Sequence, residues 1–127
     1  MMRLAIYDRI MPNTEPKYSS YANTIAKRFE DNPEMKVIGV FVDICTGNTE
    51  MKEKKELKKL LKKCKSGDVD MVITKSLSRI SRNTKDMIEI LKMIQDTETV
   101  MYFEKENTTS ETLLKAARET FPLLCMI

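Results

Sequence analysis

The chain has 127 residues, 32% charged and 42% hydrophobic, a balance that is typical of a single folded domain and excludes a disordered chain. Its net charge of +3 is too small to indicate a nucleic-acid partner by itself, and no apolar run reaches the length of a membrane span. Because the chain has no histidine and an odd set of three cysteines without metal-ligand spacing, we expect no metal, no cofactor and reduced thiols in a cytoplasmic protein.

Short apolar runs alternate with amphipathic segments along the chain. In chain order, we expect a strand at 4–7, a helix that starts after Ser19 or Ser20, a strand at 37–42, a helix at 53–65, a strand at 69–74, a helix at 83–95, a strand at 99–103 and a final helix from about 110. This alternation predicts right-handed βαβ units. We therefore expect one α/β domain over residues 1–127, with three layers and a mostly parallel four- or five-stranded sheet flanked by helices.

The helix at 53–65 is dense in lysine. Its predicted inward stripe is Leu57, Leu60, Leu61 and Cys64. Eight lysines lie between residues 52 and 65, and the only acidic residues among them are Glu53 and Glu56. This basic face is either a solvated surface or a stripe that faces phosphate groups, and the sequence leaves both open.

Arginines follow the ends of two predicted strands. Arg9 comes after the first strand, and the strand at 69–74 leads to Arg79 and Arg82 at the start of the next amphipathic helix. Cations at a helix N-terminus oppose the helix dipole, so an anionic ligand would help to explain them; a solvated first turn is the alternative. In a doubly wound sheet the two strands are neighbours. The three guanidiniums could then meet in one crevice and stabilise a phosphodiester under attack without histidine or metal.

Five segments, taken together, resemble a known family. They are Tyr7-Asp-Arg9, Asp43 with Gly47, Ser66-Gly-Asp-Val-Asp70, Ser78-Arg-Ile-Ser-Arg82-Asn and Phe103-Glu-Lys-Glu106-Asn. In this order they are similar to the catalytic domain of serine site-specific recombinases, the resolvase/invertase family. The likeness covers nearly the whole chain, and the paired arginines in the right order with the other segments are its most specific part.

The resemblance implies a metal-free reaction on DNA. In this family a serine two residues after the first-strand arginine attacks a DNA phosphate and becomes linked to the 5′ end, and strands are then exchanged within a tetramer. The resemblance implies that Arg9, Arg79 and Arg82 hold the scissile phosphate. Tyr7, Asp43 and Ser78 are implied to orient the site, and Lys54, Lys75 and Asn83 are further expected DNA contacts.

The same resemblance bears on partners. The helix from about 110 corresponds to the start of the family's dimerisation helix, so we expect a homodimer or tetramer, or a hetero-oligomer with an active recombinase. No helix-turn-helix or zinc module follows it in this sequence. We therefore expect a catalytic domain without a DNA-reading domain.

Met11 occupies the position of the family's nucleophile. A thioether has no proton to lose and cannot form a phosphodiester link to DNA. Lesser departures are Pro12 after it, Thr24 for a common glutamine, Lys54 for an arginine, and a loop after Asp43 that is one residue short. Thr14, Ser19, Ser20 and Cys45 offer other hydroxyl or thiol groups, although Ser19 and Ser20 are better explained as helix caps.

Three hypotheses follow. The first is a serine-recombinase catalytic domain that binds DNA phosphates but cannot cleave because the serine is missing. The second is a non-catalytic interaction module that pairs with another recombinase subunit through the final helix and the apolar residues 121–127. The third is an unrelated small α/β regulatory domain whose arginines match by coincidence.

Overall fold

A five-stranded sheet in the order β2-β1-β3-β4-β5 forms the centre of the protein. The computed structural model describes residues 1–13, 19–46 and 49–122. The strands are β1 (Met2–Ile10), β2 (Met35–Ile44), β3 (Met71–Thr74), β4 (Val100–Phe103) and β5 (Thr108–Thr109). The helices are α1 (Ser20–Arg28), α2 (Lys55–Lys65), α3 (Leu77–Ile80), α4 (Thr84–Gln95) and α5 (Ser110–Thr120), with a 3-10 turn η1 (Met51–Glu53) before α2. Strands β1 to β4 pair in parallel, and β5 pairs antiparallel with β4.

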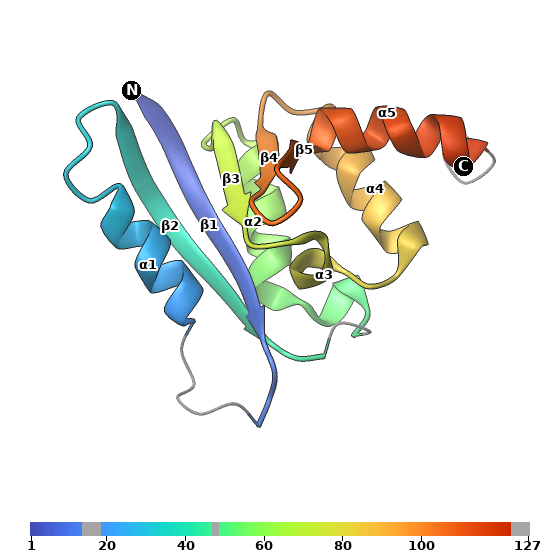
Figure 1. The fold of residues 1–127 in the computed structure, drawn as a ribbon, viewed down its shortest axis with the longest axis horizontal. Helices are drawn as coiled ribbons and strands as arrows, with labels where there is room; N and C mark the ends of the chain where they lie inside the picture. Colours follow the sequence, from blue (N-terminus) through green and yellow to red (C-terminus); the bar gives the residue numbers. More distant parts are fainter. Residues whose placement is uncertain (14–18, 47–48, 123–127) are drawn as a thin grey trace.

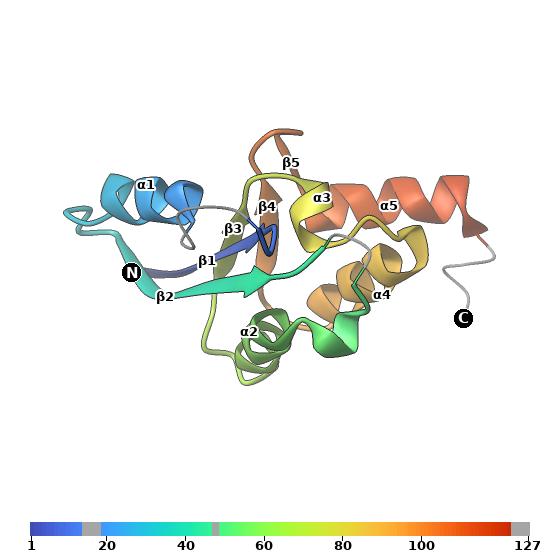
Figure 2. The ribbon, with the colours of Figure 1, turned by 90° about the horizontal axis from the view of Figure 1, so that it is seen from below.

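Helices cover both faces of the sheet and make three layers (Figures 1 and 2). Helix α1 lies on one face, and α2 and α4 lie on the other, as Figure 2 shows. The α1 face is packed around Leu4, Ile6, Ala22, Ile25 and Ile73. The opposite face holds a larger core that includes Tyr7, Leu57, Leu60, Ile90 and Leu114. The predicted three-layer α/β fold with a mostly parallel sheet is therefore confirmed.

The apolar periodicity placed the long elements well. The predicted inward stripe of α2 is buried at all four positions, from Leu57 to Cys64. Ser19 caps α1, since its side chain accepts a hydrogen bond from the Ala22 amide. In α4, Ile88 is buried and the half-buried Met87 packs against the same core, whereas the two-residue β5 was not among the expected elements.

The segment after β3 differs most from the prediction. Arg79 and Arg82 do not share the start of one amphipathic helix: Arg79 lies in the four-residue α3, and Arg82 lies in the turn before α4. The chain is extended at Ser81, and the Asn83 side chain then caps α4 by accepting from the Asp86 amide at 3.1 Å. The Asn83 cap starts a second helix, so Arg79 lies in α3 and Arg82 lies in the break between α3 and α4.

The carboxyl ends of three neighbouring strands meet at one edge of the sheet. Arg9 pairs with Asp43 between β1 and β2, and Tyr7 pairs with Thr74 between β1 and β3. This register places the residues that follow β1, β2 and β3 side by side. Separately, none of the helices in the described ranges has the length and apolar content that a membrane crossing would need.

Gly67 ends α2 in a conformation that favours glycine. Its φ is +76°, and the amides of Gly67 and Asp68 donate to the carbonyls of Cys64 and Lys63, each at 3.1 Å. An L side chain in this region is strained, so we expect Gly67→Ala to lower the free energy of unfolding by about 1 kcal/mol. Gly67→Asn should cost less, because asparagine tolerates this region. Urea unfolding of both variants measures the difference, and an alanine variant as stable as the wild type would contradict this explanation.

Candidate anion-binding site

Arg9 is the buried centre of the candidate site. Its side chain is 1% exposed, and its guanidinium reaches the exits of the two strands beside β1. Nη1 donates to the carbonyl of Cys45, just after β2, at 3.1 Å, and Nη2 donates to the carbonyl of Ser78, beyond β3, at 2.9 Å. Its Nε has no hydrogen-bond partner among the described residues. One guanidinium therefore joins the ends of three neighbouring strands.

Arg79 lies next to Arg9 and is held by a buried carboxylate. Its Nη1 donates to the Arg9 carbonyl at 3.0 Å, and its Nε lies 3.5 Å from Asp8 Oδ1. Asp8 is 3% exposed, and its Oδ2 accepts from the Ser19 hydroxyl at 2.5 Å. Asp8 therefore connects Arg79 to the start of α1.

The sequence reading did not single out Asp8. A signal for it was present, because side chains alternate along a strand and Asp8 must point away from the face that Tyr7 and Arg9 share. Asp8 therefore points to the α1 side of the sheet, where the Ser19 cap lies. The partner of Asp8 in α3 could not have been found this way, since it depends on how the chain turns after β3.

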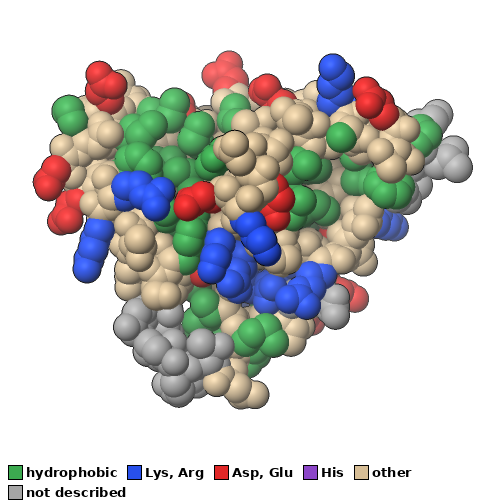
Figure 3. Space-filling model, viewed as in Figure 1, with side chains coloured by type: hydrophobic (Ala, Val, Ile, Leu, Met, Phe, Trp, Pro, Cys, Tyr) green, Lys and Arg blue, Asp and Glu red, His purple; other side chains and the backbone are tan. Residues whose placement is uncertain are grey.

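Arg82 is exposed and completes a group that we call the arginine cluster, Arg9, Arg79 and Arg82. Burial, together with the positive charges of Arg79 and Arg82, lowers the pKa of Arg9, so both exposed arginines act on the buried one through their charge. Figure 3 shows Lys and Arg side chains gathered over the region where α3 lies in Figure 1. Within the described parts of the chain, no carboxylate lies within 4.0 Å of the Arg9 guanidinium. The structure thus brings Arg79 against Arg9 and places Arg82 nearby, and a shared role of the three arginines at a phosphate stays a prediction.

Tyr7 and Asp43 form the support beside the cluster. The Tyr7 hydroxyl donates to Asp43 Oδ2 at 2.8 Å. Asp43 also accepts from the amides of Glu56 and Leu57, at 2.9 and 3.0 Å, and so caps the first turn of α2. Burial, then the negative charge of Asp43, raises the pKa of Tyr7 far above its usual value, so the phenol stays a proton donor. These contacts fit an orienting role for both residues.

Ser78 acts through its main chain. Its carbonyl accepts from Arg9, while its hydroxyl lies 2.9 Å from the Ser76 hydroxyl. Ser78 therefore contributes to the position of Arg9, and its side chain is paired within the turn after β3.

Met11 lies beside the cluster, at the end of β1. Its sulfur is 3.6 Å from Arg9 Nη1, and the residue is 47% exposed. Ser19, a candidate substitute nucleophile, is buried and paired with Asp8, and Ser20 is the first residue of α1. The interaction of Cys45 with Arg9 uses its carbonyl oxygen. Thr14 lies outside the described residues, as do Gly47, Asn48 and residues 123–127.

One of the three expected DNA contacts is corrected, and the other two stay predictions. Lys54 is 1% exposed, and its ammonium donates to the Ile80 carbonyl at 2.8 Å, so it fixes the end of α3 and presents no surface to DNA. Its burial lowers its pKa. The Asn83 side-chain oxygen caps α4, but the residue is exposed, so its contact with DNA stays a prediction. Lys75 is exposed directly after β3, and its contact with DNA stays a prediction.

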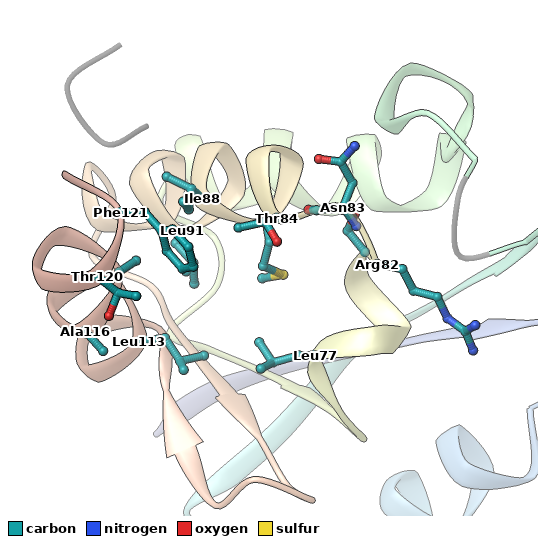
Figure 4. A pocket seen from close by; sticks show the side chains of 13 residues that line it. Leu77, Arg82, Asn83, Thr84, Ile88, Leu91, Leu113, Ala116, Thr120 and Phe121 are labelled. Atoms are coloured by element: carbon teal, nitrogen blue, oxygen red, sulfur yellow. Dashed lines mark hydrogen bonds between the residues drawn. The ribbon is translucent and has the colours of Figure 1, made fainter. Parts of the chain in front are cut away.

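An apolar groove of about 330 Å³ lies on the other side of Arg82, between α4 and α5. Figure 4 shows Leu77, Leu91, Leu113 and Phe121 around it, whereas Arg82 extends away from it toward β1. The groove and the arginine cluster are thus adjacent but face different ways. No group of three acidic or cysteine residues in the described part of the chain is placed to hold a metal ion.

Known proteins resemble the chain in sequence pattern and in fold. The family model for the resolvase N-terminal domain matches residues 14–122. The N-terminal catalytic domain of TP901-1 integrase superposes with a TM-score of 0.73 at 17% identity, over 96% of this chain and 98% of that one. A resolvase family site-specific recombinase from Streptococcus pneumoniae gives 0.67 at 17%, over 99% and 94%. The C-terminal catalytic domain of ISC1926 TnpA, an IS607-like serine recombinase, gives 0.67 at 18%, over 94% and 80%. No curated protein sequence matches.

The Tyr7–Asp43 pair gives a direct test of the support beside the cluster. Asp43→Ala removes the α2 cap and leaves the buried Tyr7 hydroxyl without its acceptor, so we expect it to lower the free energy of unfolding by about 2–4 kcal/mol. Tyr7→Phe removes one hydrogen bond and leaves the cap intact, and we expect a loss of about 1 kcal/mol. Urea unfolding gives both values. Equal losses for the two variants would contradict the capping role of Asp43.

Proposed function

Because the chain belongs to the resolvase N-terminal domain family, we propose that it acts in DNA recombination and that the arginine cluster binds a phosphodiester of the DNA backbone. The observation that carries this proposal is the convergence of three guanidiniums at the ends of β1 and β3. Guanidinium groups match phosphate oxygens in geometry and charge. Within the described residues, Asp8 is the acidic partner of the cluster, so a bound phosphate would supply negative charge that the site otherwise has little of.

The three arginines differ in exposure, and we therefore expect them to act on the phosphate in different ways. Arg82 is exposed and Arg79 is 31% exposed, so they meet the phosphate first. Arg9 is buried beside them and acts through its charge, while the Cys45 and Ser78 carbonyls fix its position. A phosphodiester under attack gains negative charge on its non-bridging oxygens, and cations held in place stabilise that state.

Because position 11 is a methionine, we expect this site to bind a DNA phosphate and not to cleave the strand. The sulfur next to Arg9 Nη1 stands where an attacking oxygen would be needed, and a thioether cannot supply one. The nearest alternative hydroxyl in the described residues that follow, Ser19, is buried and bonded to Asp8. We therefore propose that the chain binds DNA and cannot cleave it by itself.

The groove between α4 and α5 favours a second function, pairing with another recombinase subunit. Its lining is mostly apolar, and Phe121 at its rim is 44% exposed, so partner atoms would bury it. In this proposal the chain forms a homodimer, a tetramer or a hetero-oligomer with an active recombinase, in the cytoplasm where DNA is available. Size-exclusion chromatography with light scattering tests it: Leu113→Glu should shift any oligomer to monomer.

Restoring a hydroxyl at position 11 tests the cleavage proposal. We expect the unaltered chain to form no covalent adduct with a nicked suicide DNA substrate, and Met11→Ser to form some, because the serine would lie beside the three arginines. Denaturing gels detect the adduct, and Met11→Ala is the matched control without a hydroxyl. An adduct from the unaltered chain would refute the proposed loss of cleavage.

Charge reversal at the exposed arginines tests phosphate binding. We expect Arg79→Glu/Arg82→Glu to weaken binding to a short duplex by about tenfold or more at low salt, since two phosphate contacts are lost. The matched control is Arg28→Glu/Arg118→Glu, which makes the same charge change on the exposed surfaces of α1 and α5. Fluorescence anisotropy measures both affinities. Equal weakening by the two variants would point to net charge alone and sink the proposed site.

A further inference from the structure

The basic excess of the chain is concentrated on one helix. Six of the eleven residues of α2 are lysines, all exposed: Lys55, Lys58, Lys59, Lys62, Lys63 and Lys65. The helix has one acidic residue, Glu56. The remainder of the chain then has 16 basic and 18 acidic residues (22 minus 6 and 19 minus 1), so it is slightly acidic. The positive net charge is thus a local property of α2.

This arrangement is unfavourable for a helix that faces only water. Lysines at positions 55 and 59, 58 and 62, and 59 and 63 are four residues apart, and like charges at this spacing destabilise a helix. Lys55 and Lys58 lie in the N-terminal half of α2, where the helix dipole disfavours cations. The three lysines of the last turn lie at the other end of the helix, where the dipole favours them. The one ion pair that relieves this face, among the described residues, joins Lys59 to Glu56 at 3.0 Å. A polyanion would relieve the repulsion.

The face is also hollowed. A shallow cavity of about 350 Å³ lies between α2 and β2, and Lys59, Lys62 and Lys63 line it. Phe41 and Ser66 complete the lining, and Asp68 places one carboxylate on the rim. Three lysine side chains around one concave surface carry ammonium groups that can reach a phosphate oxygen, which lysine binds as a point charge.

The lysine face, the six α2 lysines named above, is separate from the arginine cluster. Helix α2 covers the sheet face opposite α1, and its first turn is tied to Asp43 beside the cluster. Its inner stripe is buried against the core, and the lysines occupy the exposed sides of the helix. We propose that the lysine face is a second DNA-binding surface, which holds the phosphate backbone of duplex DNA without reading its sequence.

The dimensions agree with this ligand. Eleven residues of helix span about 16 Å, and that length of duplex carries about ten phosphate charges along its axis. Ammonium groups on flexible stems bind such a row without base contacts. The proposal rests on the proposed function for the choice of DNA as the polyanion, and the test below keeps the two surfaces apart.

The experiment compares Lys59→Gln/Lys62→Gln/Lys63→Gln with Lys27→Gln/Lys36→Gln/Lys115→Gln. Both triple variants lose three exposed lysines, but the second set lies on α1, β2 and α5. Anisotropy titrations with a duplex of unrelated sequence are run between about 50 and 200 mM salt. We expect the α2 variant to bind about tenfold more weakly and to lower the salt dependence of log K by about two to three, whereas the control changes little.

Thermal unfolding of both variants shows that any loss of binding is not a loss of fold. The α2 variant should melt close to the temperature of the wild type, because the substitutions remove like-charge pairs together with the Lys59–Glu56 ion pair and two favourable charges in the last turn. Equal weakening of DNA binding by the α2 and control variants would overturn the proposal. So would a result in which the α2 variant keeps its DNA affinity and loses binding to phosphatidylserine vesicles, which would assign the face to a membrane surface.

A variant with Arg79→Glu/Arg82→Glu separates this inference from the proposed function. If the arginine cluster does not bind DNA, these two changes leave the affinity unaltered, and the α2 substitutions still reduce it. If both surfaces bind, the combined variant has the losses of both. If the cluster binds and the α2 substitutions have no further effect, the lysine face is not a DNA surface.

Discussion

The site depends on one buried cation. The guanidinium of Arg9 donates to main-chain carbonyls beyond β2 and beyond β3, so one side chain fixes the relative positions of three strand exits. These carbonyls accept two of its hydrogen bonds but do not neutralise its charge. Taking a full positive charge out of water is unfavourable by several kcal/mol unless an anion lies nearby. Arg9 is therefore a buried charge at the edge of the sheet, and a bound anion such as phosphate would stabilise it.

Alternation along β1 distributes the other contacts around this cation. Tyr7 and Arg9 point to the α2 side of the sheet, where Asp43 accepts from Tyr7 and caps α2. Asp8, between them, points to the α1 side, where it meets Ser19 and reaches Arg79. Three consecutive residues thus tie both helical layers to the arginine cluster. A change in the register of β1 would exchange these faces and disconnect both layers together.

The sequence was informative where local pattern decides structure. Apolar periodicity located the strands and the buried stripe of α2, and the neighbouring positions of β1 and β3 followed from the βαβ rule. The sequence pattern did not predict features that depend on a single turn or on a contact distant in sequence. The break at Ser81 separates Arg79 from Arg82, and no periodicity spans so short a piece as α3. The burial of Lys54 was equally hidden, because its partner is a main-chain carbonyl, Ile80, 26 residues away in sequence.

Met11 and the arginine cluster together allow three possible roles of the site to be compared: packing, DNA cleavage, and DNA binding without cleavage. A site that served only for packing would be more stable with an apolar residue than with a buried guanidinium, since the ion pays a desolvation penalty that carbonyls only partly return. A site that served cleavage would need an oxygen beside Arg9, and a sulfur is there. Binding without cleavage needs the cations and not the oxygen. Of these three roles, binding without cleavage is therefore the one we propose, because it requires the buried Arg9 and does not require an oxygen at position 11.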